Sequence, residues 1–397
     1  MKILIVSSYY FPELGAAPSR ITNMAEGLQK QGMEVDILTC LPNYPKGKIF
    51  DGYKGKFSLH EQHHGINIFR YWTYATVSKS PLLRILNMLC FSFLLWSFVW
   101  KRKRIKEYEA VVVQSPPIMV AYSAIALFKK VFKKKVVLNV SDLWPTSAVD
   151  LGAVKEGSLY HKVLLGMERF IYKHADAIQG QSNEILKHIE QFEPQKPLFL
   201  YRNLQQSEDA EEAISPRKGE TFKIVYAGLL GVAQDMLSLI EAIDFRAINA
   251  EFHLYGGGNQ TQKIEQYIAE HQTGVVYHGY RSKEEINKVL KDFDASIVPL
   301  ATQIKGAVPS KIFNLLPVGI PILLCGGGEA ADIIEDYKIG YTSAPKDYEG
   351  LKQNILRLAQ LSDEEFKAIK ENCLHASRTD FNFETQMEKY AAFLRNL

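Results

Sequence analysis

The sequence predicts an α/β protein made of two doubly wound domains, each built on a parallel sheet. Short apolar runs that end in small residues alternate with amphipathic stretches, which is typical of strand–helix–strand units. The alternation begins at residues 2–7 and begins again near residue 221, after a polar and charged segment, 205–220, that has no apolar periodicity. The length of 397 residues suits two domains of about 100–200 residues each. We expect an N-terminal domain over 1–203 that a final amphipathic helix, 381–397, completes, and a C-terminal domain over 204–380.

The first half contains five apolar runs that read as strands. They cover residues 2–7, 35–40, 66–72, 110–114 and 136–140. Helices are expected over 19–31, where Gly32 provides the stop, and over 117–132. The runs at 110–114 and 136–140 are β-branched at consecutive positions, which indicates strands buried on both faces of a parallel sheet.

The second half repeats this organisation. Strands are expected over 221–227, 250–255, 275–278, 295–299 and 321–325, and helices over 259–271, 282–292 and 310–316. Ligands of open α/β sheets bind at the carboxyl ends of the strands. Two such domains that face each other would place both of these edges across one cleft, so the loops that leave the strands are the candidate site.

Charge is divided unevenly along the chain. The hydrophobic fraction of 47% and the charged fraction of 23% are ordinary and exclude a disordered protein. The net charge of +3 hides a basic half, with 26 Lys and Arg against 16 Asp and Glu in residues 1–200, and an acidic half, with 21 against 28 in residues 201–397. The basic half is expected to face a membrane surface, a nucleic acid or a phosphorylated ligand. The four cysteines, at positions 40, 90, 325 and 373, have no metal or redox spacing and fit a reducing cytoplasm.

The most hydrophobic stretch is 85–100, and the basic cluster KRKRIK, 101–106, follows it. Its 16 residues fall short of the roughly 20 that a spanning helix needs. Two interpretations stay open: a helix that lies in a membrane interface, or a buried core helix with a solvated basic end. A second basic tract, 129–135, lacks aromatic interleaving and any recognition motif, which favours a solvated helix end or an anionic lipid over nucleic acid.

Two loops of the first half could carry chemistry. In 13–20, ELGAAPSR, a glycine and two alanines precede a helix and Arg20 adds a charge, so the loop is either an anion site or a tight structural turn. Fingerprints of a dinucleotide or triphosphate site are absent. Asp142 follows a buried strand, where its carboxylate could accept a proton or hold a hydroxyl, or could cap the following helix.

Three loops of the second half point to a nucleotide or diphosphate ligand. Glycines follow strand ends at 255–259 and 325–335, where backbone N–H groups can meet an anion. In 308–314, Ser310 is expected to cap a helix whose first turn contains Lys311. A lysine there is unfavourable to the helix dipole, and a bound anion would explain it. No Cys/His metal-ligand set or nucleophile elbow is visible, and His63 and His64 read as loop residues.

Several segments, in their shared order, carry a resemblance to a known family. They are YYFPELGAAPSRI (9–21), LPNYPKGKIFDGY (41–53), SPP (115–117), SDLWPTSAVDLG (141–152), YAGLLGVAQDM (226–236), GAVPSKIF (306–313) and VGIPILLCGGGEAADII (318–334). The chain resembles the family-four glycosyltransferases of the two-domain GT-B fold, with two Rossmann-like domains facing across a cleft. It is most similar to the WbuB-like branch, which acts in O-antigen, capsule and exopolysaccharide assembly.

The resemblance implies a UDP-sugar donor in the C-terminal domain and, in the N-terminal domain, a glycan acceptor on a polyprenyl diphosphate. It also implies retention of anomeric configuration and no metal or cofactor. Asp142 and Lys311 would be the catalytic residues. The implied donor-side residues are Gly228, Gly231, Gln234, Gly257, Tyr280, Arg281, Ser310, Asn314, Gly327, Gly328 and Glu329, and the acceptor-side residues are Gly15, Ala16 and Arg20.

The sequence departs from the family pattern at several positions. Gly306 and Asn314 stand where relatives often have two glutamates, the second of which contacts the ribose. The Arg and Lys that many relatives place after the GxxG loop are absent from 232–234, so Lys311, with Lys305 or Arg281, would have to supply that charge. Ser141 replaces a histidine that many relatives have before the Asp of the DLWP segment. These changes indicate a variant site.

The function expected from the sequence is transfer of an N-acetylated hexose or a deoxyhexose from a UDP-sugar to a lipid-linked glycan. The protein would be cytoplasmic and peripheral on the inner face of the cytoplasmic membrane through 85–106, without nucleic acid as a partner. Two alternatives stay open. One is a nucleotide-sugar epimerase or hydrolase, and the other is a noncatalytic nucleotide-sugar-binding or scaffold protein.

Overall fold

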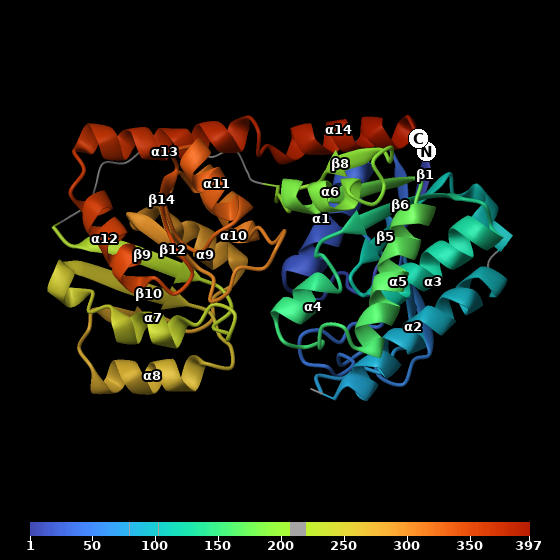
Figure 1. The fold of residues 1–397 in the computed structure, drawn as a ribbon, viewed down its shortest axis with the longest axis horizontal. Coiled ribbons are helices and arrows are strands. Elements are labelled where there is room, and N and C mark those ends of the chain that lie inside the picture. The colour runs from blue at the N-terminus through green and yellow to red at the C-terminus, as the bar shows by residue number, and fades with distance from the viewer. Residues whose placement is uncertain (79, 102, 207–219) are drawn as a thin grey trace. The chain divides into compact units, whose positions relative to one another are not determined.

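The chain forms two compact units in the computed structural model, which describes residues 1–397 except 79, 102 and 207–219 (Figure 1). The N-terminal unit contains residues 1–206 together with 383–397, and the C-terminal unit contains residues 207–382. Most of the expected linker, 205–220, lies outside the described residues. The last helix, α14 (Phe383–Arg395), belongs to the N-terminal unit, where it contacts α1 (Ala16–Lys30).

The N-terminal unit is built on a sheet of eight strands in the order β3-β4-β2-β1-β5-β6-β7-β8. All five strands expected from the sequence are confirmed: β1 (Lys2–Val6), β2 (Glu34–Cys40), β4 (Ile66–Tyr71), β5 (Ala110–Ser115) and β6 (Lys135–Val140). The unexpected strands lie at the two sides of the sheet: β3 (Ser58–His63), β7 (Ala177–Gly180) and β8 (Leu198–Leu200). Only β3 is antiparallel, and its sequence SLHEQH is too polar to show an apolar run.

Helices connect these strands. Besides α1 and α14 they are α2 (Pro81–Lys101), α3 (Ile118–Ile125), α4 (Thr146–Asp150), α5 (Leu159–His174) and α6 (Asn183–Glu190), with short segments η1 (Lys103–Glu107) and η2 (Ala126–Val131). The helix expected over 117–132 is α3 continued by η2, which is π-helical. The helix expected over 19–31 begins earlier, at Ala16, because Pro18 fits within a first helical turn.

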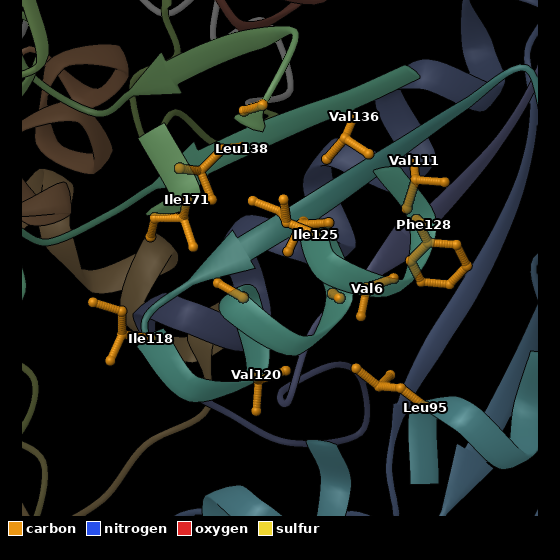
Figure 2. Packing of buried hydrophobic residues seen from close by; sticks show 14 of the residues in the cluster. Val6, Leu95, Val111, Ile118, Val120, Ile125, Phe128, Val136, Leu138 and Ile171 are labelled. Atoms are coloured by element: carbon orange, nitrogen blue, oxygen red, sulfur yellow. The ribbon is translucent and has the colours of Figure 1, made fainter. Parts of the chain in front are cut away.

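A hydrophobic core lies between the sheet and helices α2, α3 and α5 (Figure 2). Val111 of β5 and Leu138 of β6 pack there with Ile125 of α3 and Ile171 of α5. Burial of such side chains contributes about 1.5–3 kcal/mol each. This packing holds the carboxyl ends of β5 and β6, and the loops that follow them, in place.

Helix α2 has two apolar faces. Phe91, Leu95 and Phe98 are at most 1% exposed and pack into the core. The opposite stripe, named here the α2 stripe, consists of Leu86, Leu89, Phe93 and Trp96, with Phe93 71% and Trp96 45% exposed. The buried-core interpretation of 85–100 is therefore confirmed for one face of the helix, whereas the opposite face is an exposed apolar surface and the membrane-interface interpretation stays a prediction.

Within the described part of the chain, no helix is long and apolar enough to cross a bilayer. The expected basic cluster at 101–106 includes residue 102 and neighbouring side chains that lie outside the described residues.

The C-terminal unit is built on a fully parallel sheet of six strands in the order β11-β10-β9-β12-β13-β14. The strands are β9 (Phe222–Ala227), β10 (Ala250–Tyr255), β11 (Val275–Tyr277), β12 (Ala295–Pro299), β13 (Ile322–Cys325) and β14 (Gly340–Ser343). The first five confirm the expected strands, whereas β14, GYTS, was not predicted because it is short and polar.

The helices of this unit are α7 (Met236–Ala242), α8 (Thr261–Glu270), α9 (Lys283–Val289), α10 (Ser310–Leu315), α11 (Glu329–Asp336), α12 (Tyr348–Ala359) and α13 (Asp363–Arg378), with short segments η3 (Arg246–Ile248), η4 (Leu290–Asp292) and η5 (Leu316–Val318). Both units are doubly wound α/β domains, as the sequence predicts. The carboxyl edge of each sheet carries the loops that were singled out above.

Candidate functional site

In the C-terminal unit, the glycine loops that follow β9 and β10 lie backbone against backbone. Gly228 N–H donates to the carbonyl of Tyr255 at 2.9 Å, and Leu230 N–H donates to the carbonyl of Gly257 at 3.1 Å. A Cβ added to Gly256, whose φ is +134°, would lie 1.8 Å from the Gly228 oxygen. Gly257 differs, because no described atom lies within 4 Å of where its Cβ would be. Gly256 is therefore needed for close packing, and Gly257 leaves room for a ligand.

Lys311 extends from α10 toward these loops. Its Nζ lies 3.8 Å from the centroid of the Tyr226 ring, and a Cβ on Gly228 would meet it at 2.1 Å. Burial lowers the pKa of Lys311 to about 7. Among the described residues, no carboxylate is within ion-pair distance of it. A cation placed in a desolvated site with only an aromatic ring beside it is suited to binding an anion.

The expected cap at the start of α10 is wrong. The N-cap position is taken by Pro309 in an extended conformation, and Ser310 is the first helical residue, without a capping hydrogen bond. Because Ser310 already has helical backbone geometry, its side chain cannot occupy the capping position. Its hydroxyl stays a candidate ligand group next to Lys311.

Two amide oxygens of the implied donor site are buried without a hydrogen-bond partner among the described residues. They are Oδ1 of Asn314, on the same helix as Lys311, and Oε1 of Gln234. The Gln234 oxygen lies 3.2 Å from where a Cβ on Gly231 would stand. An unpaired buried acceptor costs about 1–3 kcal/mol, so both oxygens are suited to receive hydrogen bonds from a ligand.

The loop after β13 leads into α11. Gly328, with φ +67°, is the N-cap, and Glu329 is the buried first residue of the helix. A Cβ on Gly327 would lie 2.8 Å from Oε1 of Gln303, so the loop at 301–305 approaches it closely. The backbone joins the same two loops, because Leu300 N–H, just after β12, donates to the carbonyl of Cys325, the last residue of β13, at 2.8 Å.

Tyr280 and Arg281 lie apart from this group. They follow β11, the outermost strand of the sheet, and both are exposed, Tyr280 to 69%. Sequence reasoning missed the ring stack next to them. There His278 stacks on Tyr255 with centroids 4.4 Å apart, and its Nε2 lies 2.9 Å from Nδ1 of His253. Alternating positions on β10 place Tyr255 and His253 on one face of the sheet.

In the N-terminal unit, the loop that contains Gly15 is held by the carboxylate of Glu13. This buried side chain accepts hydrogen bonds from the backbone N–H groups of Tyr10 at 3.1 Å and of Asn43 and Tyr44 at 2.8 Å each. Gly15 is the N-cap of α1 with φ +130°, and Ala16 is the first helical residue. Glu13 therefore joins the loops after β1 and β2, a role that its position in the sequence did not signal.

Arg20 is buried, and its Nε and Nη1 have no hydrogen-bond partner among the described residues. It is 2% exposed, its guanidinium stacks 4.8 Å from the Tyr201 ring, and its Nη2 donates to Oδ1 of Asn139 at 2.8 Å. Burial lowers the pKa of Arg20 to about 10. Asn139 donates in turn to Gln114, whose Nε2 donates to Oγ of Ser141 at 2.8 Å. This buried chain links α1 to the ends of β5 and β6.

Asp142 is next to Ser141, the last member of this hydrogen-bond series, in the loop that follows β6. It does not cap α4, because the N-cap is Pro145 and no side chain bonds the helix start. No described residue donates a hydrogen bond to its carboxylate. Burial raises the pKa of Asp142 to about 6, and the nearby Arg20 charge opposes the rise. A partly desolvated carboxylate with a pKa near neutrality is suited to accept a proton.

One group of possible metal ligands occurs within the described chain, formed by Glu26, His63 and His64, with ligand atoms within 4.8 Å of one another. The two imidazole rings stack with centroids 3.9 Å apart, and His64 Nδ1 lies 3.0 Å from the Glu26 carboxylate. Stacked rings direct their in-plane lone pairs side by side rather than at one point. The contact is therefore better described as a hydrogen bond with ring stacking than as a preformed metal centre.

Comparison with known proteins assigns both units to glycosyltransferase domains. The family model for "Glycosyl transferase 4-like domain" matches residues 15–197, and the model for "Glycosyl transferases group 1" matches residues 221–361. The probable glycosyltransferase WbjE of Pseudomonas aeruginosa is 26% identical over 278 residues, which cover 66% of this chain and 68% of the relative. The putative colanic acid biosynthesis glycosyl transferase WcaI of Escherichia coli K12 is 24% identical over 338 residues, which cover 80% of this chain and 82% of the relative.

The fold agrees with these matches. The solved structure of Anabaena HepE in complex with UDP superimposes with a TM-score of 0.70 at 13% identity and covers the whole of both chains. The fold is GT-B, with two Rossmann-like α/β domains. Together these findings support a glycosyltransferase of family four.

Proposed function

We propose that this chain transfers a sugar from a UDP-linked donor in the C-terminal unit to a polyprenyl-diphosphate-linked glycan in the N-terminal unit, during assembly of a surface polysaccharide. The proposal includes membership of the WbuB-like branch. It also includes the identity of the donor sugar, which is an N-acetylated hexose or a deoxyhexose. The name of WcaI, a colanic acid biosynthesis protein, supports a role in polysaccharide assembly. The structure of HepE, which was solved with UDP, supports UDP as the nucleotide of the donor.

The single observation that carries the proposal is the desolvated ammonium group of Lys311 against Gly228. A diphosphate that fills the space over Gly257 would supply the anion that this cation lacks among the described residues. The buried oxygens of Asn314 and Gln234 would accept hydrogen bonds from ribose hydroxyls or the base. As the bond to the sugar breaks, negative charge grows on the diphosphate, and Lys311 stabilises it most at that moment.

On the acceptor side, Asp142 would position the acceptor hydroxyl or take its proton. Its raised pKa, about 6, keeps the carboxylate ionised at neutral pH while making it a better base than an exposed aspartate. The lipid would be met by the α2 stripe, whose exposed Phe93 and Trp96 can enter an interface, in a half of the chain with surplus positive charge. We therefore propose peripheral attachment to the inner face of the cytoplasmic membrane.

We further propose transfer with retention and without a metal ion or other cofactor. Lys311 and the backbone donors of the glycine loops would neutralise the diphosphate, which is the role a divalent cation has in other transferases.

The test is transfer by the purified 397-residue chain from a panel of UDP- and GDP-sugars to a short-chain polyprenyl-diphosphate glycan, followed by mass spectrometry, with and without EDTA. We expect a product with a UDP-sugar that is insensitive to EDTA, and NMR of the product should show the donor's anomeric configuration. Sugar release or epimerisation without acceptor would favour the hydrolase or epimerase alternative. Donor binding without transfer to any acceptor would favour a noncatalytic role.

A further inference from the structure

A buried arginine of the N-terminal unit has no carboxylate directly beside it. Arg20 of α1 is 2% exposed, and among the described residues no carboxylate is within ion-pair distance of its guanidinium. Nη2 donates to Oδ1 of Asn139 at 2.8 Å, whereas Nε and Nη1 have no hydrogen-bond partner in the described part of the chain. Burial of an incompletely paired charge is costly. An opposite charge at longer range would offset part of this cost, and Asp142 supplies one.

Asp142 is the charged group that Arg20 faces. The interaction is mutual, since the guanidinium opposes the burial that raises the pKa of Asp142 to about 6, and the carboxylate opposes the burial that lowers the pKa of Arg20 to about 10. The other titratable groups that face Arg20 are the phenols of Tyr201 and Tyr390. Burial raises the pKa of both phenols, so they are uncharged at neutral pH. Among the described residues, Asp142 and Arg20 are therefore each other's counter-charge.

Buried amides also connect the guanidinium to the loop that contains Asp142. Asn139, which accepts from Arg20, donates to Gln114, and Nε2 of Gln114 donates to Oγ of Ser141 at 2.8 Å. Both amide side chains are buried. The backbone N–H of Ser141, the residue before Asp142, is bound to the Ser115 carbonyl of β5 at 2.9 Å. Buried networks of this kind favour one arrangement of their members. The orientation of Asn139 therefore depends on Arg20, and the start of the loop depends on Asn139.

Aromatic rings hold the guanidinium in place on its other side. It stacks on the ring of Tyr201, with 4.8 Å between the guanidinium carbon and the ring centroid. The Tyr201 ring in turn contacts the ring of Tyr390 on α14, with centroids 5.1 Å apart. A desolvated contact between a cation and an aromatic ring contributes about 2 kcal/mol. The charge of Arg20 is therefore fixed at one position, which is the condition for a constant effect on Asp142.

We propose that Arg20 is a positioning residue for Asp142: its amide contacts hold the loop after β6, and its charge keeps the Asp142 carboxylate ionised. Arg20 acts through Asp142 in this role and does not need to touch a substrate. The effect on sugar transfer rests on the proposed function, in which Asp142 positions the acceptor hydroxyl or takes its proton. The coupling of the two charges is a property of the folded chain, and it can be measured without any substrate.

The test is an NMR titration of the Asp142 carboxyl carbon in the 397-residue chain labelled with ¹³C-aspartate, where the signal missing from Asp142→Asn identifies the residue. In Arg20→Gln we expect the proton affinity of this carboxylate to rise about tenfold, because a nearby opposite charge is lost. Asn139→Asp keeps the arginine and places a new carboxylate against its Nη2, so it should change the titration in the same direction. Arg169→Gln, at an exposed arginine of α5, is the control and should titrate like the wild type.

Kinetics complete the test. In Arg20→Gln the rise of kcat/KM with pH should move to higher pH together with the titration of Asp142. Wild-type methyl NMR signals of Ile125 and Ile171, in the core of the N-terminal unit, show that a variant is folded. If Arg20→Gln does not fold, Asn139→Asp decides alone.

Two results would overturn the proposal. One is an Asp142 titration that is unchanged in the folded variants. The other is a raised KM for the acceptor with an unchanged titration, which would assign Arg20 to direct contact with the acceptor. A shifted titration with undiminished transfer at every pH would support the coupling and count against the role of Asp142 in the proposed function alone.

Discussion

The ammonium group of Lys311 lies 3.8 Å from the centre of the Tyr226 ring and fills the space that a side chain on Gly228 would need. The strand β9 supplies Tyr226 and the loop after it supplies Gly228, while α10 supplies the lysine from a position 85 residues further along the chain. The absence of a Cβ at Gly228 allows the cation to reach the edge of the sheet. The consequence is a cation that is desolvated and paired with no carboxylate of the described chain.

Replacement of this cation should weaken donor binding. In Lys311→Met we expect the Kd for UDP, measured by calorimetry, to rise about 10- to 100-fold, since a hydrogen bond to a charged group contributes about 1.5–3 kcal/mol. Lys263→Met, at an exposed lysine of α8, is the matched control and should bind UDP normally. A Kd that stays within twofold of the wild type in Lys311→Met would show that the lysine does not contact the nucleotide.

Donor binding should depend on pH through the same group. Burial lowers the Lys311 pKa to about 7, so above pH 7 the free protein loses the proton that the diphosphate requires. UDP is already fully ionised there, because its last phosphate pKa is about 6. Affinity for UDP should therefore fall between pH 7 and 9, by up to about tenfold per pH unit. The dependence should vanish in Lys311→Met, and its persistence in that variant would assign it to another group.

Asp142 should control turnover rather than donor binding. Asp142→Asn keeps the size of the side chain and removes its basicity, so kcat should fall about 10²- to 10⁴-fold with little change in the Kd for UDP. In the wild type the carboxylate form is the active one, so kcat/KM should rise with pH through about 6, where burial places the pKa of Asp142. Asp150→Asn, on the exposed end of α4, is the control. Near-normal turnover in Asp142→Asn would remove this residue from the chemistry.

The glycines after β10 should differ in their tolerance of a side chain. Gly256→Ala would place a Cβ 1.8 Å from the Gly228 oxygen at a φ of +134°, so the two loops must separate. Strain of this kind costs about 1–3 kcal/mol, and we expect lower thermal stability together with weaker UDP binding. Gly257→Ala meets no described atom within 4 Å and should unfold like the wild type. Equal melting temperatures for the two variants would contradict the backbone contact.

The α2 stripe should govern attachment to membranes. Phe93→Glu combined with Trp96→Glu should reduce co-sedimentation with anionic vesicles several-fold, because two inserted apolar side chains are lost and charge repulsion is added. Val163→Glu, at an exposed valine of α5, adds a charge elsewhere on the same unit and should leave binding close to that of the wild type. Unchanged sedimentation of the stripe variant would exclude this helix as the membrane contact.

The central strands were predictable because burial on both faces leaves its mark directly on the sequence. β5 and β6 are runs of consecutive apolar residues, and both lie where the pattern places them. The strands β3 and β14 escaped prediction because they lie at sheet edges, where solvent on one side permits polar residues such as those of SLHEQH. The interior strand β7 also escaped prediction although all of its residues are buried, because AIQG is too short to show an apolar run. Local patterns therefore record burial only where a strand is long and apolar enough to show it.

The site was predictable only at the level of loops and residue types. The sequence signalled Lys311 by its unfavourable place in a first helical turn, and the structure supplies the Tyr226 ring and the bare Gly228 beside it. Arg20 was expected to line the acceptor side, which stays a prediction, and only the structure shows that its buried guanidinium donates to Asn139. Glu13, which binds three backbone N–H groups, had no sequence signal, because nothing local distinguishes a carboxylate that folds inward from one that is solvated.

The sequence by itself determined two doubly wound α/β domains, an uneven distribution of charge and an ordered set of motifs that resembles one glycosyltransferase family. These features follow from periodicity, composition and spacing along the chain. Only the tertiary structure decided which groups meet or face solvent: the lysine with a glycine 83 positions before it, and the two apolar faces of α2. The reason is that desolvation depends on what surrounds a group in space, and desolvation lowers the Lys311 pKa.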